Sequence, residues 1–284
     1  MAQQVQARPP ALPTRLPPID FLQTSRKDAW WLQSLVVFTV FSAFIAYSTW
    51  AGLQGDNYYF GNYLSPFYSP ELYGEGPHAL FGPQPSWWPS WLIFSPAMLI
   101  LWAPVSFRFT CYYYRGAYYK AFWSDPVSCS VGEPRKGARL GEKETSYRGE
   151  RFLPLILQNA HRYTLPFAFA LIAFLTWDAW KALWFTDPAT GATSFGVGVG
   201  SLVLAINVLL LSSYTFGCHS VRHLVGGRLV QISKKPLQYK AYKGVSFLNR
   251  NHALFAWCSL VWVGFSDVYV RMLAMGVWTD WRIF

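Results

Sequence analysis

The thiols and imidazoles of this sequence fall, with few exceptions, beside the ends of long apolar runs. The chain has four Cys and five His. Thiolate and imidazole together bind zinc tetrahedrally or a two-iron cluster with two Cys on one iron and two His on the other, and two His from different helices hold a haem. This pattern predicts a redox cofactor near one membrane face. The residues concerned are Cys111, His161, Cys218, His219, His223 and His252.

The spacing of these residues is only weakly specific. The sequence has no Cys-x-x-Cys and no repeated Cys-x-His. On a helix, His219 and His223 share a face, whereas Cys218 is turned about 100° from His219, so one of the two His can point elsewhere. The role of His252 stays open between a ligand and an interfacial hydrogen-bonding group. Cys129 is a reserve thiolate if its loop folds back.

Five apolar runs place the chain among membrane proteins. Hydrophobic residues make up 52% of the sequence and charged residues 13%. A helix of about 20 apolar residues crosses the roughly 30 Å hydrocarbon core. We therefore predict an all-α, polytopic membrane protein, a bundle of five transmembrane helices. The runs are about 30–50, 87–108, 162–178, 195–217 and 253–266, the third and fifth having charges only near one end.

The distribution of cations predicts the orientation. Of 24 Lys and Arg, four precede the first run, ten lie from Arg108 to Arg162 and seven lie from Arg222 to Arg250. The segment 51–90 has acidic residues but no Lys or Arg. With five spans, all three basic regions fall on one side, which the positive-inside rule assigns to the cytoplasm. We expect a cytoplasmic N-terminus and an outside C-terminus.

The segments outside the runs suggest a tail and two longer loops. Residues 1–28 are polar and rich in Pro and lack the apolar core of a signal peptide, which predicts a cytoplasmic tail. Residues 29–284 form the five-helix domain, with an outer loop at about 52–88 and a basic cytoplasmic loop at about 124–151. The second helix is expected to continue past the bilayer through 107–123, which places Cys111 near the boundary.

Three other classes of function compare poorly with this pattern. The basic residues alternate with membrane spans and have no recognition motif, so nucleic-acid binding is excluded. A transporter would have charged residues in mid-span or broken helices in matching halves, which these runs lack. A structural anchor without a cofactor remains an alternative. Absorption and EPR spectra would distinguish haem, cluster and neither.

Several segments together resemble the membrane-anchor (C) subunit of actinobacterial-type succinate dehydrogenase, a succinate:quinone oxidoreductase. The similarity extends over about 30–275. It implies a subunit of the respiratory chain and tricarboxylic acid cycle, in the bacterial plasma membrane, that binds a flavoprotein subunit and an iron-sulfur subunit and has no succinate site. The segments are 109–119 (FTCYYYRGAYY), 158–163 (QNAHRY), 217–227 (GCHSVRHLVGG), 251–252 (NH) and 262–267 (WVGFSD).

The resemblance also implies a cofactor. Anchors with two haems have His ligands at both membrane depths, and this chain has none near the outer helix ends. The resemblance favours a Rieske-type [2Fe-2S] cluster, with haem b as the alternative. We expect Cys111 and Cys218 as thiolates, with His161 and either His219 or His223 as imidazoles. Electrons from succinate would pass through flavin, the partner's clusters and this centre.

The electron acceptor implied by the resemblance is a membrane quinone, menaquinone or ubiquinone. Arginine would hold charge near the head group and tyrosine would donate a hydrogen bond. Arg222 has the alternative role of marking the inner boundary. The type of quinone, the direction of the reaction and a higher oligomer of the complex stay open. The residues expected at the quinone are Tyr113, Arg115, Arg162, Tyr163 and Arg222.

Overall fold

A computed structural model describes residues 27–111, 114, 156–186, 190–227, 229 and 232–284. Tyr113, Arg115 and Cys129, the basic loop and nearly all of the N-terminal tail lie outside the described residues. The described elements are, in chain order, α1 (Trp30–Gln54), β1 (Tyr59–Phe60), β2 (Tyr63–Leu64), η1 (Pro96–Leu99), α2 (Trp102–Phe109), α4 (Ile156–Lys181), β3 (Trp184–Thr186), β4 (Thr193–Phe195), α5 (Val199–Phe216), α6 (His219–Gly226), α7 (Pro236–Arg250) and α8 (His252–Ala274).

Four of the described helices are long and apolar enough to cross a membrane, which confirms the prediction of a helical membrane protein. These stretches are Trp31–Gln54, Ala160–Lys181, Val199–Phe216 and His252–Ala274. Large apolar side chains stay exposed along them, as in helices that face lipid. The first helix ends at Gly55, whose φ of 70° is the left-handed conformation that glycine favours at such ends.

The second apolar run does not form the long helix that its hydropathy predicts. It contains the 3₁₀ turn η1 followed by α2, whose 8 residues span only about 12 Å. Prolines explain part of this difference, because the residue before a proline avoids the helical conformation. The predicted helix through 107–123 is also wrong at its start. Helix α2 ends at Phe109, and the Thr110 hydroxyl lies 2.9 Å from the Ser106 carbonyl.

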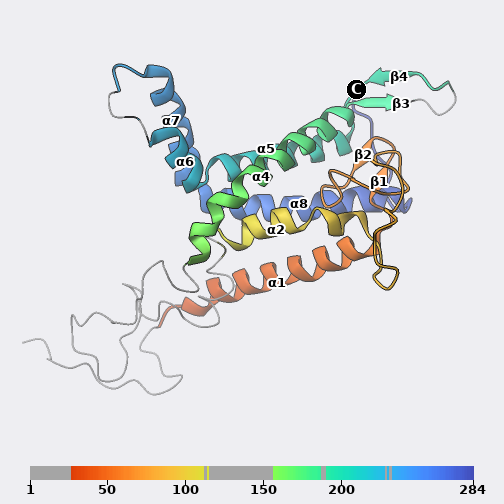
Figure 1. The fold of residues 1–284 in the computed structure, drawn as a ribbon, viewed down its shortest axis with the longest axis horizontal. Helices are drawn as coiled ribbons and strands as arrows, with labels where there is room; N and C mark the ends of the chain where they lie inside the picture. The colour runs from red at the N-terminus through yellow and green to blue at the C-terminus, as the bar shows by residue number, and fades with distance from the viewer. Residues whose placement is uncertain (1–26, 112–113, 115–155, 187–189, 228, 230–231) are drawn as a thin grey trace, which may run out of the picture.

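The helices alternate in direction, so their ends collect at two levels (Figure 1). At the level that we call the thiol end, α1, α4 and α8 begin and α2 and α5 end. The opposite level, the loop end, holds two antiparallel hairpins, β1–β2 and β3–β4. Helix α5 packs against both α4 and α8, while α2 packs against α4. The remaining helices α6 and α7 form an arm at the thiol end that crosses the direction of the bundle (Figure 1).

The core is divided along the bundle. One cluster of buried side chains lies at the thiol end and includes Phe107, Cys111, Tyr214 and Cys218. Two further clusters lie toward the loop end, around Tyr68 and around Tyr63. The cluster around Tyr63 depends on glycine, because a Cβ atom at Gly200 would lie 2.5 Å from the Tyr63 ring. The thiol end therefore has its own packed interior.

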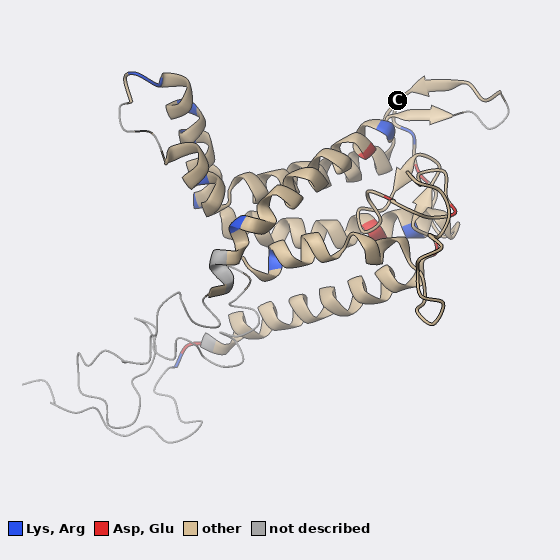
Figure 2. Cartoon of the chain, in the orientation of Figure 1, with Lys and Arg blue, Asp and Glu red and all other residues tan. Residues whose placement is uncertain are grey.

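A buried ion pair within α8 lies near the loop end, where acidic and basic residues lie close together (Figure 2), and its hydrogen bonds link α8 to α1. Arg271 and Asp267 are 1% and 0% exposed, and their Nε and Oδ2 atoms lie 3.4 Å apart. The hydroxyls of Tyr47 (2.5 Å) and Ser65 also donate to Asp267. The other guanidinium nitrogens donate to the Gln54 side chain and to the carbonyls of Asp56 and Ala51. The charges predicted near the end of this run thus have protein partners.

Removing only one charge of this pair should destabilise the protein strongly. Arg271→Met leaves the Asp267 carboxylate uncompensated, which costs about 3–5 kcal/mol. The double variant Asp267→Leu/Arg271→Met should recover a large part of that loss, because an apolar pair replaces a desolvated ion pair. Thermal denaturation of the detergent-solubilised protein measures both. A double variant as unstable as the single one would contradict this account.

Candidate functional site

Two thiols and two imidazoles from separate segments lie in the packed interior of the thiol end. Cys111 follows α2, His161 belongs to the first turns of α4, Cys218 is the N-cap of α6 and His252 is the first residue of α8. Their exposed fractions lie between 2% and 7%. Polar side chains this deeply buried need partners, so their contacts indicate what the site is built to hold.

Each thiol lies beside one imidazole. The His161 Nε2 atom is 3.0 Å from Cys218 Sγ, and His252 Nε2 is 3.8 Å from Cys111 Sγ. The sharp step from α5 into α6 brings Cys218 to this place. Gly217 permits it, since a Cβ atom there would lie 2.8 Å from the Ser213 carbonyl oxygen. The Cys218 sulfur also accepts a hydrogen bond from the Ser220 amide at 3.4 Å.

Thr110 fixes the tautomer of His161. Its hydroxyl lies 2.9 Å from His161 Nδ1 and within reach of the carbonyls of Ser106 and Phe107. A carbonyl only accepts, so the hydroxyl donates its hydrogen there and accepts from the Nδ1–H group. The lone pair of His161 is then on Nε2, facing Cys218. Ligating imidazoles are held in the same way, with the other nitrogen donating to a fixed partner.

Aromatic rings cover both imidazoles. Phe107 stacks on His161 with ring centroids 4.3 Å apart, and Tyr214 stacks on His252 at 4.9 Å. The Arg108 guanidinium lies 4.7 Å from the centre of the Tyr214 ring. It donates to Ser259 Oγ at 3.0 Å and to the Tyr114 hydroxyl. Aromatic rings therefore cover both imidazoles, and a cation lies against the ring that covers His252.

The environment keeps the sulfur of Cys218 neutral. Burial raises the pKa of this thiol above its usual value, and the neighbouring Cys111 raises it further. The amide and hydroxyl of Ser220 act in the opposite direction but do not reverse the shift. A thiolate here needs a cation as a direct partner, because desolvation penalises the charged form. Within the described residues, no group of three or more His, Cys, Asp or Glu side chains surrounds a single ion position.

The structure does not bring His219 or His223 to the thiols. Both are exposed on α6, and their Nε2 atoms lie 3.0 Å apart. Burial and the neighbouring His223 lower the pKa of His219. The imidazole found beside Cys111 is that of His252, whose role the sequence left open. Its position at the start of a span, at the depth of His161, is the signal that favours it.

The described residues that were predicted to bind quinone do not lie together. Arg162 and Tyr163 are exposed on α4. Arg222 donates to the Tyr242 hydroxyl at 2.8 Å, between α6 and α7. Tyr113 and Arg115 lie outside the described residues. None of the described three lines the cavity next to the Cys and His residues.

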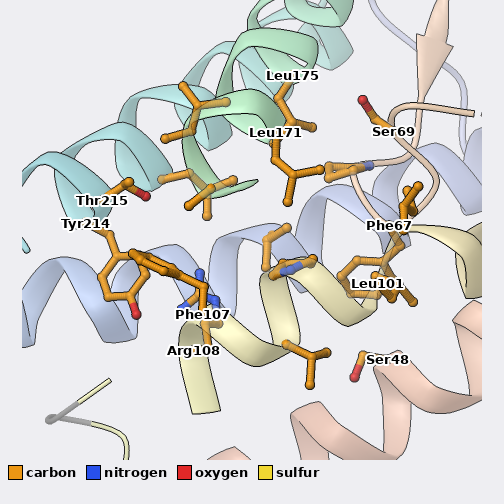
Figure 3. A pocket seen from close by; sticks show the side chains of 18 of the residues that line it. Ser48, Phe67, Ser69, Leu101, Phe107, Arg108, Leu171, Leu175, Tyr214 and Thr215 are labelled. Atoms are coloured by element: carbon orange, nitrogen blue, oxygen red, sulfur yellow. The ribbon is translucent and has the colours of Figure 1, made fainter. Parts of the chain in front are cut away.

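That cavity encloses about 200 Å³ and lies within the bundle (Figure 3). Phe107, Arg108 and Tyr214 form one end of its wall, and Phe67 and Ser69 form the other. Most of the lining is apolar, including Leu171 and Leu175 of α4. Because Phe107 and Tyr214 each stack on an imidazole, one layer of rings separates the cavity from His161 and His252. Sequence reasoning missed this site, since none of its residues forms a motif.

Comparisons with known proteins agree with one another. Residues 32–276 match a family described as actinobacterial succinate dehydrogenase subunit SdhC. A chain of the solved Mycobacterium smegmatis Sdh1 complex in the apo form is 38% identical, with a TM-score of 0.77. The match covers 92% of this chain and 94% of that one. No curated protein matches in the sequence comparison.

Proposed function

Because this chain belongs to the family of the actinobacterial succinate dehydrogenase subunit SdhC, we propose that it relays electrons to a membrane quinone through a Rieske-type [2Fe-2S] cluster at its thiol end. The observation that carries the proposal is the meeting of two buried thiols and two buried imidazoles from four segments. As the membrane anchor it joins the flavoprotein and iron-sulfur subunits of the enzyme, which oxidise succinate. The complex lies in the bacterial plasma membrane.

The donor set fits such a cluster better than it fits zinc. A tetrahedral zinc ion needs its four ligands around one point, and no three donor side chains among the described residues share such a point. A two-iron cluster divides the four donors, with two thiolates on one iron and two imidazoles on the other. We assign Cys111, Cys218, His161 and His252 as the ligands, with His252 in place of the His219 or His223 of the sequence prediction. When bound, the cluster accepts and returns single electrons, at a potential raised by imidazole ligation.

The surrounding side chains prepare these ligands. Thr110 orients His161, and the stacked Phe107 and Tyr214 rings exclude water from the imidazoles. The Arg108 guanidinium lies 4.7 Å from the centre of the Tyr214 ring, which stacks on His252, and so puts a positive charge behind this ring. Fixed orientation and a dry shell are the two features by which a protein tunes a bound metal. Haem b remains the alternative cofactor. A haem held by two imidazoles would make no use of the two buried thiols.

Ligand variants separate the two assignments of the imidazoles. Cys218→Ser and His252→Ala should abolish the rhombic EPR signal of the dithionite-reduced complex, because each removes a donor to one iron. His219→Ala and His223→Ala are matched controls on the exposed face of α6 and should keep the signal. Iron per complex is measured in parallel. A retained signal in His252→Ala, or a Soret band in the wild type, would overturn this ligand set.

The cavity is the best place for the quinone. It lies in the bundle next to the imidazoles, and its apolar wall suits an isoprenoid chain. Arg108 and Tyr214 stand at the end nearest the cluster ligands (Figure 3). Tyrosine can donate a hydrogen bond to a quinone oxygen, and the guanidinium can balance negative charge that develops there. This assignment replaces the exposed Arg162 and Tyr163.

Filling the cavity should block quinone reduction selectively. Leu171→Trp places a bulky ring in the lining and should lower succinate:quinone reductase activity on the order of tenfold. Succinate oxidation by a soluble dye, which bypasses the membrane subunit, should be unchanged. Leu202→Trp on the exposed face of α5 is the matched control. Equal quinone activity in both variants would exclude the cavity as the quinone site.

We also propose that the chain crosses the membrane five times, with α2 as the short crossing, and that the thiol end faces the cytoplasm. The support is the alternation of helix directions together with the excess of cations beyond the thiol end. In this orientation the iron-sulfur partner approaches the cluster ligands directly. The C-terminus then lies outside.

Reporter fusions test this topology. Alkaline phosphatase fused after Phe284 should be active, because this enzyme folds only outside the cytoplasm. A fusion truncated at Gly227, which ends in the arm at the thiol end, should be inactive. A green fluorescent protein fused at the same two positions should give the reverse result. An active Gly227 fusion would reverse the orientation.

A further inference from the structure

The arm formed by α6 and α7 is a braced unit. Arg222 of α6 donates to the Tyr242 hydroxyl at 2.8 Å and to Ser246 at 3.2 Å. Gln238 donates to the Val225 carbonyl at 2.7 Å. The two helices approach closely at Gly226, where a Cβ atom would lie 2.7 Å from the Tyr242 ring. The arm therefore holds a defined direction.

Both roots of the arm are tied to membrane spans. Helix α6 begins three residues after Phe216, the last residue of one span, and α7 ends two residues before His252, the first of the next. Asn249 closes the roots by donating to the Gly217 carbonyl at 2.8 Å. The arm crosses the direction of the spans (Figure 1). A rigid arm rooted at this depth and turned in this way runs along the membrane surface.

Helix α7 presents two different strips on the face that it turns away from α6. No described side chain of this helix is buried. One strip is apolar and the other is basic, and both follow the helical repeat. Leu237 in the first is 80% exposed, and Phe247 beside the second is 55% exposed. The apolar strip is Leu237, Ala241, Gly244 and Leu248; the basic strip is Lys240, Lys243 and Arg250.

We propose that α7 lies in the headgroup layer of the membrane and binds anionic phospholipids, its apolar strip toward the acyl chains and its basic strip toward the phosphates. Residues 219–250 contain seven Lys and Arg and no Asp or Glu. A helix with these adjoining strips matches the change from hydrocarbon to phosphate across an interface. The iron-sulfur partner that delivers electrons would instead cover the end of the bundle. The inference does not depend on the cofactor.

Spin labels on the two strips test the depth of α7. Ala241→Cys and Lys243→Cys are labelled with a nitroxide in the complete complex, with Cys258 and Cys129 replaced by Ser. The complex is placed in discs of phosphatidylcholine alone or mixed with phosphatidylglycerol. In the mixed discs, the ratio of oxygen to nickel-chelate relaxation should be several-fold higher at 241 than at 243. That contrast should weaken in phosphatidylcholine alone and at high salt, because headgroup attraction is screened.

Charge variants separate lipid binding from other causes. Lys240→Gln together with Arg250→Gln should remove the dependence of the label at 241 on phosphatidylglycerol, whereas Lys240→Arg keeps the charge and should preserve it. Because residues 219–250 contain no Asp or Glu, a loss of attraction to phosphatidylglycerol in the double variant comes from the removed cations. Two outcomes would overturn the proposal. Labels that both contact the nickel chelate place α7 in water, and labels shielded from both relaxants place it under another subunit.

Discussion

The architecture depends on the absence of water from the hydrocarbon core. Backbone amides and carbonyls inside a bilayer must pair within the chain, so each crossing is helical wherever lipid surrounds it. Successive crossings must run in opposite directions, so the end of one crossing and the start of the next lie at the same depth. Cys111, His161, Cys218 and His252 are separated by as much as 141 residues, as the contact between Cys111 and His252 shows. They meet because each belongs to a helix end at one level.

The same constraint explains where irregular backbone is tolerated. The stretch before α2 is not an α-helix, and some of its backbone groups pair in tight turns, such as the Met98 amide with the Ser95 carbonyl at 3.0 Å. Ser95 donates to the Gly52 carbonyl at 2.5 Å, and the Tyr68 hydroxyl donates to the Ala51 carbonyl at 2.7 Å. Side chains that follow α1 in the sequence thus satisfy carbonyls of its last turn. The shortness of α2 leaves room beside it, and the cavity is lined from this helix on one side and from α4 on the other.

Much of the fold could be predicted from the pattern of apolar residues along the chain, because four of the apolar runs form helices long enough to cross a membrane. The helix predicted for the second run, at about 87–108, was too long. Hydropathy counts its Trp, Pro and Leu residues as apolar but does not register that Pro89 and Pro96 interrupt helical hydrogen bonding. Beyond Cys111, the segment that the second helix was expected to cover lies outside the described residues, except for Tyr114.

The site was only partly predictable. Cys111, Cys218 and His161 stand at run ends, so their common depth followed from the hydropathy pattern. His219 and His223 share that depth, yet they point outward, and the difference from His252 depends on rotation about helix axes, which depth does not determine. Arg108 and Tyr214 had no motif to mark them, because a cavity wall is assembled from several helices. A membrane span can be predicted from residues that are neighbours in the sequence, whereas contacts between distant segments cannot.

Cys218 has two tasks, since it is both a proposed iron ligand and the residue that caps the first turn of α6. Its sulfur accepts from the Ser220 amide, a weak bond compared with the oxygen caps that helices usually use. The position of a candidate ligand and the first turn of the arm are thereby linked through a single atom. Because Cys218 also lies 3.0 Å from His161, one residue fixes both the entry of the arm and the surroundings of an imidazole on another helix.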